Sequence, residues 1–160
     1  MECQLMNSEF EEIIKELPIL MKSLKESTLF TKYEVNPALD QGIYVFYEHG
    51  RPMYVGRSGR KGRIKQRIME HSRPSSGHNT ATFAFLIAKE DAENTKIDLK
   101  KSRDDLQEDA DFEPIYTKAK ERVSKMQVRV IEINNPITQT LFEVYAALEL
   151  KTEYNEWGTH

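Results

Sequence analysis

Residues 42–57, which read GIYVFYEHGRPMYVGR, carry the clearest structural signal in the chain. Two short β-like runs, Ile43–Tyr47 and Met53–Val55, flank a turn signal at 49–52, which reads His-Gly-Arg-Pro. Aromatic and β-branched side chains favour strands, whereas glycine and proline favour the turn between them. This stretch therefore predicts a β-hairpin.

The segments around the hairpin are mostly helical by pattern. Apolar residues recur at helical spacing from Phe10 to Leu24, and Pro18 should kink this helix or open a second one. The later segments are, in chain order, a basic helix roughly from Lys61 to His71, an apolar run Thr82–Ala88 that is either helix or strand, a weak polar helix Lys96–Gln107, an amphipathic helix Phe112–Met126, a strand Gln127–Ile133, and a helix capped by Asn135 that ends near Lys151.

These elements predict an α/β or α+β domain with a small antiparallel or mixed sheet of about three strands surrounded by helices. A length of 160 residues is enough for one domain with its own core. We expect a helical N-terminal extension over 1–35, a core over 42–155, and an expanded helical middle over about 75–126.

The composition indicates a soluble, helix-rich protein, because 31% of the residues are charged and 39% are hydrophobic. No apolar run approaches the ~20 residues that a membrane span needs, and the start lacks a basic and apolar leader. We therefore expect no membrane partner and a cytoplasmic location. Cys3 has no partner for a disulfide or a zinc site, which favours an incidental thiol.

The charges are unevenly distributed along the chain, although the net charge is only -3. The stretch from His49 to His78 contains one carboxylate, Glu70, and many basic residues: Arg51, Arg57, Arg60, Lys61, Arg63, Lys65, Arg67 and Arg73. The stretch 90–113 is acidic instead. The pattern indicates a basic patch on an acidic molecule, either a nucleic-acid surface or a solvated charged face.

The last helix contains a carboxylate in an apolar setting. A core stripe is predicted on one side, at Ile137, Leu141, Val144, Tyr145 and Leu148, and a second apolar side at Phe142, Ala146, Ala147 and Leu150. Glu143 projects from that second side. Because an unpaired buried carboxylate is costly, Glu143 must either pair with an arginine or bind a metal ion.

The basic helix places Arg63, Arg67 and His71 on one stripe, at i, i+4 and i+8, with Ile64 and Ile68 turned toward the core. A planar guanidinium can bind phosphate through two parallel hydrogen bonds. The stripe therefore indicates a phosphate-binding surface, with a solvated face as the alternative for Arg63.

The triplets Gly42-Ile43-Tyr44 and Tyr54-Val55-Gly56 together resemble the two halves of the motif that names the GIY-YIG nucleases. The family's later arginine, glutamate and asparagine are matched by Arg67, Glu143 and Asn155 in the same order. The spacing from the glutamate to the asparagine is similar to that in the N-terminal nuclease domain of the bacterial excision-repair nuclease. The resemblance extends over 42–155, with the middle segment expanded.

The resemblance implies a metal-dependent endonuclease that cuts phosphodiester bonds in nucleic acid, with DNA the expected partner. It implies that Glu143 binds one Mg²⁺ or Mn²⁺ ion and that Tyr44 or Tyr54 accepts a proton from the attacking water. The other implied roles are charge stabilisation by Arg67, positioning by Asn155 and auxiliary proton transfer by His71. The basic patch adds phosphate binding by Arg57, Arg63, Lys65 and Arg73 as an expectation. Because tyrosine is a poor base at neutral pH, we expect the arginines and the metal to lower its pKa.

The sequence departs from the family pattern in two places: the second triplet reads YVG, and Arg57 stands where many members have lysine. One alternative function is a DNA-binding or assembly module that lacks activity. Another is a structural protein in which Glu143 pairs with Arg67. The oligomeric state stays open.

A shared site requires Tyr44 and Tyr54 to lie on the same face of the hairpin. Side chains alternate along a strand, so a regular two-residue turn at His49-Gly50 would place the two tyrosines on opposite faces. We therefore expect a three- or five-residue loop, or a β-bulge, within Tyr47–Pro52, with Gly50 at positive φ.

Overall fold

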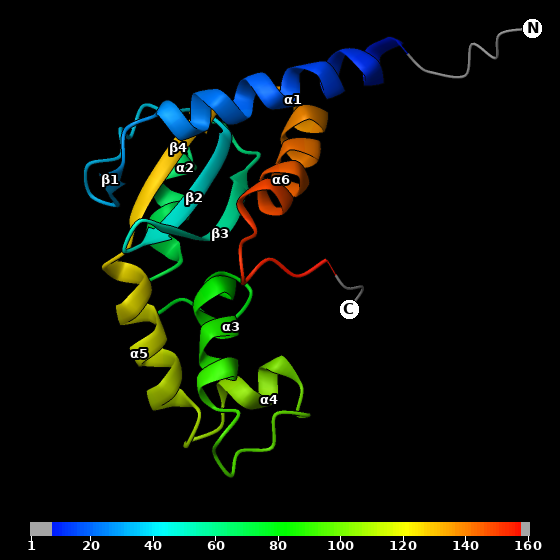
Figure 1. Cartoon of the computed structure of the whole chain (residues 1–160). Coiled ribbons are helices and arrows are strands. Elements are labelled where there is room, and N and C mark those ends of the chain that lie inside the picture. The colour runs from blue at the N-terminus through cyan, green and yellow to red at the C-terminus, as the bar shows by residue number, and fades with distance from the viewer. Residues whose placement is uncertain (1–7, 158–160) are drawn as a thin grey trace, which may run out of the picture.

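The computed structural model describes residues 8–157. Its elements are, in chain order, α1 (Ser8–Glu26), β1 (Phe30–Thr31), β2 (Gly42–Glu48), β3 (Arg51–Ser58), α2 (Ile64–Glu70), α3 (Thr82–Asp91), α4 (Arg103–Gln107), α5 (Glu113–Ser124), β4 (Gln127–Glu132) and α6 (Pro136–Leu150), as labelled in Figure 1. Cys3, interpreted above as an incidental thiol, lies outside the described residues.

The strands form one antiparallel sheet in the order β1-β4-β2-β3. The α+β prediction is confirmed, but the sheet has four strands where the sequence predicted about three. The additional strand, β1, has two residues, which is too short for an alternating pattern to appear. Since β3 lies at the edge, one side of its backbone has no partner strand.

Helices cover both faces of the sheet (Figure 1). On one face, α1 and α6 pack against Ile43, Val45 and Val55 of the hairpin. On the other face, α2 packs against the hairpin and Phe83 of α3 contacts Phe46, while α5 packs on α3 in the same core. The predicted expanded middle thus includes α3 and α5, which build one of the two cores.

The hairpin contains the predicted β-bulge. His49 and Gly50 form a two-residue turn with φ values of 50° and 78°, so Gly50 has the expected positive φ. Phe46 pairs with Tyr54, but Tyr47 pairs with Pro52, which leaves Met53 as an extra residue in β3. The bulge therefore places Tyr54 on the same face of the hairpin as Tyr44. The turn has two residues, so the alternative of a three- or five-residue loop is not what the structure uses.

The glycines of the two triplets are required by close packing. A Cβ on Gly56 would lie 2.5 Å from the ring of Tyr44, and a Cβ on Gly42 would collide with the backbone of Ile131 in β4. Gly56 thus lets the Tyr44 ring lie closely over β3, and Gly42 lets β4 approach β2 closely.

Several helix boundaries differ from those predicted. α1 continues through Pro18 because Pro18 and Ile14 are exposed, so the carbonyl that proline leaves without a partner can reach water. The undecided run at 82–88 is helical. The weak helix predicted from Lys96 begins only at Arg103, where Ser102 accepts a hydrogen bond from the Asp105 backbone N–H.

The start of α6 is as predicted, since Asn135 Oδ1 accepts hydrogen bonds from the backbone N–H groups of Ile137 and Thr138. The predicted core stripe was wrong in part, because Ile137 is 52% exposed and Leu148 is 67% exposed. The helix buries its other side, which carries Phe142, because that side faces β3 and α1. Among residues 8–157, no helix is both long and apolar enough to cross a membrane.

We predict that Gly56→Ala destabilises the protein by about 1–3 kcal/mol, because the new methyl group would overlap the Tyr44 ring. Tyr44 cannot move aside easily, since it is fully buried and hydrogen-bonded to His71. Urea denaturation measures the free energy of unfolding. Gly59→Ala is the control: the nearest atom to its Cβ is Gln139 Oε1 at 3.7 Å, and its effect should stay within about 0.5 kcal/mol. Equal effects of the two substitutions would contradict the packing role of Gly56.

Candidate active site

Tyr44 and Tyr54 project from one face of the hairpin toward His71. The Tyr44 hydroxyl lies 2.7 Å from His71 Nε2, in a hydrogen bond whose direction depends on the histidine tautomer. The ring centroids of Tyr44 and Tyr54 lie 5.5 and 5.4 Å from that of His71. Tyr44 and His71 are fully buried, whereas Tyr54 is partly exposed. Of these three side chains, Tyr54 is the one that solvent can reach.

Burial dominates the proton affinities of this cluster. It raises the pKa of Tyr54 to about 12, with a further increase from Glu143 and a decrease from Arg67. Burial likewise raises the pKa of Tyr44 well above its ordinary value. Arg67 acts on the pKa of both tyrosines in the expected, lowering direction, but desolvation outweighs it, so a net decrease would need the contribution of the metal ion as well. Burial, assisted by Arg67, lowers the pKa of His71, so His71 is neutral near pH 7.

Glu143 enters the site from α6 and pairs with Arg57 of β3, with 3.0 Å between Glu143 Oε2 and Arg57 Nε. The Glu143 side chain is only 18% exposed. Burial raises the pKa of this carboxyl group, and Arg57 partly opposes the increase. The structural alternative predicted the wrong partner: the ion pair is made by Arg57 rather than by Arg67.

Arg67 lies on α2 close to both tyrosines, where its charge affects their pKa values. Its Nη1 donates a hydrogen bond to the Thr80 carbonyl at 2.7 Å and lies 3.5 Å from Glu70 Oε2. Arg63 Nη2 lies 2.7 Å from the other oxygen of Glu70. Two guanidinium groups therefore share one carboxylate, which holds them together and leaves a net positive charge.

The predicted stripe of Arg63, Arg67 and His71 needs one correction. His71 is fully buried beneath the arginines rather than lying beside them on the surface, because α2 ends at Glu70 and the chain turns inward. Ile64 and Ile68 face the core as expected.

Asn155 satisfies the open edge of β3. Its Oδ1 accepts the Val55 backbone N–H and its Nδ2 donates to the Val55 carbonyl, both at 2.8 Å. Thr152 Oγ1 also donates to Asn155 Oδ1. In addition, the Tyr154 backbone N–H donates to the carbonyl of the bulge residue Met53. The amide of Asn155 thus acts as a short additional strand and fixes the C-terminal segment beside Tyr54.

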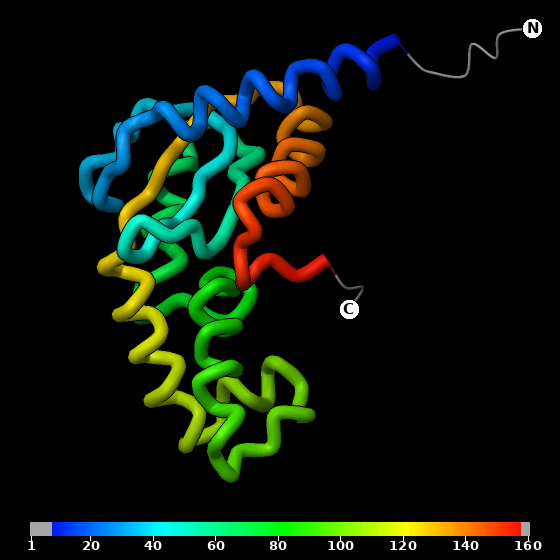
Figure 2. The backbone as a smooth tube through the Cα atoms, viewed as in Figure 1, coloured from blue at the N-terminus to red at the C-terminus, as the bar shows by residue number. Residues whose placement is uncertain are grey.

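A hollow of about 110 Å³ opens where these segments meet. Tyr54, Glu143 and Asn155 line it, and Phe83 of α3 stacks on the Tyr54 ring with 4.8 Å between centroids. Figure 2 shows the chain after α6 passing the first turn of α3, and residues of both segments line the hollow. Six further lining residues were not predicted from the sequence, namely Thr82, Leu86, Arg103, Tyr154, Glu156 and Trp157.

None of the four predicted substrate-binding residues lines this hollow, although Arg57 pairs with Glu143, which does. Lys65 Nζ donates to the Tyr33 carbonyl at 2.6 Å, on the side of α2 near β1. Arg73 is exposed in the loop after α2. The structure therefore brings Tyr54, Arg57, Glu143 and Asn155 together at the surface, with Tyr44, Arg67 and His71 behind them.

The residues present fit one sparsely coordinated divalent cation better than a closed protein site. Among residues 8–157, no three His, Cys, Asp or Glu side chains form a group that could hold a metal ion. Glu143 offers a single partly buried carboxylate at the edge of a hollow. Magnesium accepts one or two carboxylates, with water and substrate phosphate as its other ligands.

No protein-family model matches the chain significantly, and neither does any curated protein or solved structure. The resemblance to the GIY-YIG nucleases therefore depends on the motif residues and on their geometry alone.

We predict that Glu143→Gln makes the protein more stable at pH 7. The gain should shrink as the pH falls through the raised pKa that Glu143 has in the folded state, and should be gone below about 4.3, the ordinary carboxyl pKa. Because the folded state raises the pKa of Glu143, it binds this proton more tightly than the unfolded state, so ionisation at higher pH costs stability. Denaturation at a series of pH values measures the difference.

Glu149→Gln on the same helix is the control and should change the stability by no more than about 0.5 kcal/mol, because Glu149 is exposed. A Glu143→Gln protein that is less stable than wild type at pH 7 would show that the ion pair with Arg57 outweighs the cost of burial.

Proposed function

We propose that the chain is a metal-dependent endonuclease that hydrolyses phosphodiester bonds in DNA at a GIY-YIG type site. One observation carries the proposal: side chains from β3, α6 and the segment after α6 meet around one small hollow, although about 100 residues separate Tyr54 from Asn155. Tyr54, Glu143 and Asn155 are all motif residues predicted from the sequence. Their approach to one another is a property of the fold that the motif did not require.

The hollow can hold a phosphodiester between charged and proton-carrying groups. Arg57 at its edge and Arg67 behind it offer positive charge to the phosphate oxygens, and this charge is most valuable when negative charge accumulates in the transition state. Tyr54 presents the one accessible hydroxyl of the buried cluster, so it is our choice for the group that takes the proton of the attacking water.

Tyr54 needs a change in its surroundings before it can act as a base, because its pKa is about 12 in the free protein. Removing the negative charge of Glu143 would act in the required direction, since that charge raises the pKa. A divalent cation bound by Glu143 would neutralise the carboxylate and polarise the phosphate.

The buried groups behind Tyr54 have supporting roles. Tyr44 and His71 hold each other by a hydrogen bond and pack against the Tyr54 ring, which keeps its hydroxyl in the hollow. Asn155 positions the C-terminal segment by hydrogen-bonding both backbone groups of Val55 in β3. We propose that the enzyme acts in the cytoplasm, with Arg63, Lys65 and Arg73 extending the phosphate-binding surface along α2 and the loop after it.

A second candidate function is a DNA-binding or assembly module without activity. The observation that favours it is the ion pair between Glu143 and Arg57, because a carboxylate already paired with an arginine has less affinity for a metal ion. The two candidates differ in whether the Glu143 carboxylate is needed for cleavage or only for the fold.

We predict that purified protein nicks or linearises plasmid DNA in the presence of Mg²⁺ or Mn²⁺, and that Glu143→Gln lowers the rate by at least about 10²-fold. The variant should stay folded and bind DNA, because glutamine keeps the size of the side chain. Gel electrophoresis of the plasmid over time gives the rate.

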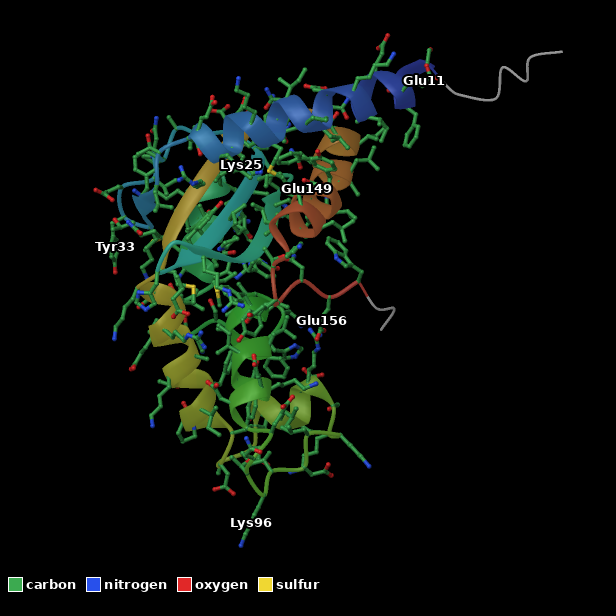
Figure 3. All side chains as sticks on the ribbon, in the orientation of Figure 1. Glu11, Lys25, Tyr33, Lys96, Glu149 and Glu156 are labelled. Carbon is green, nitrogen blue, oxygen red and sulfur yellow. The ribbon has the colours of Figure 1, made fainter. Side chains whose placement is uncertain are left out.

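Glu149→Gln is the matched control, since Glu149 lies on the same helix but at the surface (Figure 3). It should cleave within about twofold of wild type. DNA binding without cleavage by the wild-type protein with either metal would favour the inactive module. A Glu143→Gln rate within severalfold of wild type would remove the metal-binding role of Glu143.

A further inference from the structure

A second hollow, of about 270 Å³, lies on the side of the fold near β1. Three segments meet there: the turn after β1 contributes Lys32, the loop after α2 contributes Ser72, and α5 contributes Lys120. These segments come from the N-terminal extension, the basic stretch and the expanded middle. None of the three residues belongs to the proposed active site.

The two lysines of this hollow are unusually buried for charged residues. Lys32 is 7% exposed and Lys120 is 8% exposed. Lys32 Nζ donates to Ser72 Oγ at 2.8 Å, and Lys120 Nζ donates to the carbonyls of Pro74 and Ser76 at 2.8 and 2.9 Å. All these acceptors are neutral. The rings of Tyr33 and Tyr116, whose centroids lie 5.1 and 4.2 Å from the ammonium groups of Lys32 and Lys120, attract the two charges without neutralising them.

Neither lysine forms an ion pair with any of residues 8–157 within 4.0 Å. Of the same residues, Glu121 is the one carboxylate residue that lines the hollow, but it is exposed and pairs with neither lysine. Burial lowers the pKa of Lys120 despite an opposing effect of Glu113, which shows that the surrounding carboxylates do not fully compensate for the desolvation. Buried charges are ordinarily paired, so two such lysines at one hollow favour an anion as its ligand.

We propose that this hollow binds a phosphate group, held by Lys32, Lys120 and the hydroxyl of Ser72. An ammonium group with three donors and a nearby hydroxyl are suited to a compact anion with several acceptor oxygens.

The position of the hollow indicates a backbone phosphate of bound nucleic acid as its source. Lys65 of α2 donates to the carbonyl of Tyr33, which also lines the hollow, and Arg73 is exposed directly after Ser72. Basic side chains of α2 and its following loop thus connect this hollow with Arg67 behind the active site. This part of the inference rests on the proposed function, whereas phosphate binding by itself does not.

The first test measures the melting temperature of the whole chain while inorganic phosphate replaces chloride at constant ionic strength. Because a ligand that binds only the folded state stabilises it, we expect an increase of roughly 2–4 °C for the wild type at high phosphate. Lys32→Met keeps the length of the side chain without its charge and should lose the increase. Lys118→Met, on the exposed side of α5, should keep it.

Lys32→Met is preferred to a change at Lys120, since Lys120 also holds the loop that contains Pro74 and Ser76. Equal melting-temperature increases in wild type and Lys32→Met, or none in wild type, would overturn the proposal. This test needs neither DNA nor cleavage, so its result is separate from that of the proposed function.

The second test identifies the source of the phosphate by measuring DNA binding against salt concentration in metal-free buffer. If a backbone phosphate occupies the hollow, Lys32→Met should reduce the slope of log K against log salt by about 0.9 on duplex DNA. Lys118→Met should leave the slope unchanged. A lost thermal response to phosphate with an unchanged slope would support a site for free phosphate or a nucleotide and would overturn the assignment to the DNA backbone.

Discussion

The candidate site depends on the one extra residue in the β2–β3 hairpin. With a two-residue turn at His49 and Gly50, an unbroken register would turn Tyr54 toward α1 and α6, on the face that buries Val55. The bulge at Met53 reverses this parity and places Tyr54 above Tyr44, where Phe83 and His71 enclose it. The pairing of the two tyrosines is therefore a consequence of register.

The bulge also creates the docking place for the end of the chain. It leaves the Met53 carbonyl free at the sheet edge, and the Tyr154 backbone N–H takes it, while Asn155 takes both backbone groups of Val55. These bonds bring the segment after α6 back to the hairpin about 100 residues away in sequence. The helix α6 directly precedes that segment, so Glu143 of α6 also lies near β3, where it pairs with Arg57.

Local patterns were enough to predict the hairpin, the Asn135 cap and the α+β class, because each depends on neighbouring residues. The expectation of a bulge or a longer loop came from requiring Tyr44 and Tyr54 to share one face. The pairing of Glu143 with Arg57 and the positions of Arg103 and Trp157 beside the hollow depend on which segments the fold brings together. No local pattern encodes this. The exposed Ile137 and Leu148 on α6 show the same limit: apolar residues lie on both sides of that helix, and the fold alone decides which side is buried. The order of the motif residues predicted a shared site, but the net effect of burial on the tyrosines required the structure.

The central claim is that one metal-dependent site forms where β3, α6 and the C-terminal segment meet. Titration with paramagnetic Mn²⁺, followed by NMR signals of the backbone amides, tests it directly. We predict that signals of residues 55–57, 142–144 and 155 broaden first and that Glu143→Gln abolishes this broadening. Broadening centred on the acidic stretch 90–113, with the signals around Glu143 unchanged, would contradict a metal site at this place.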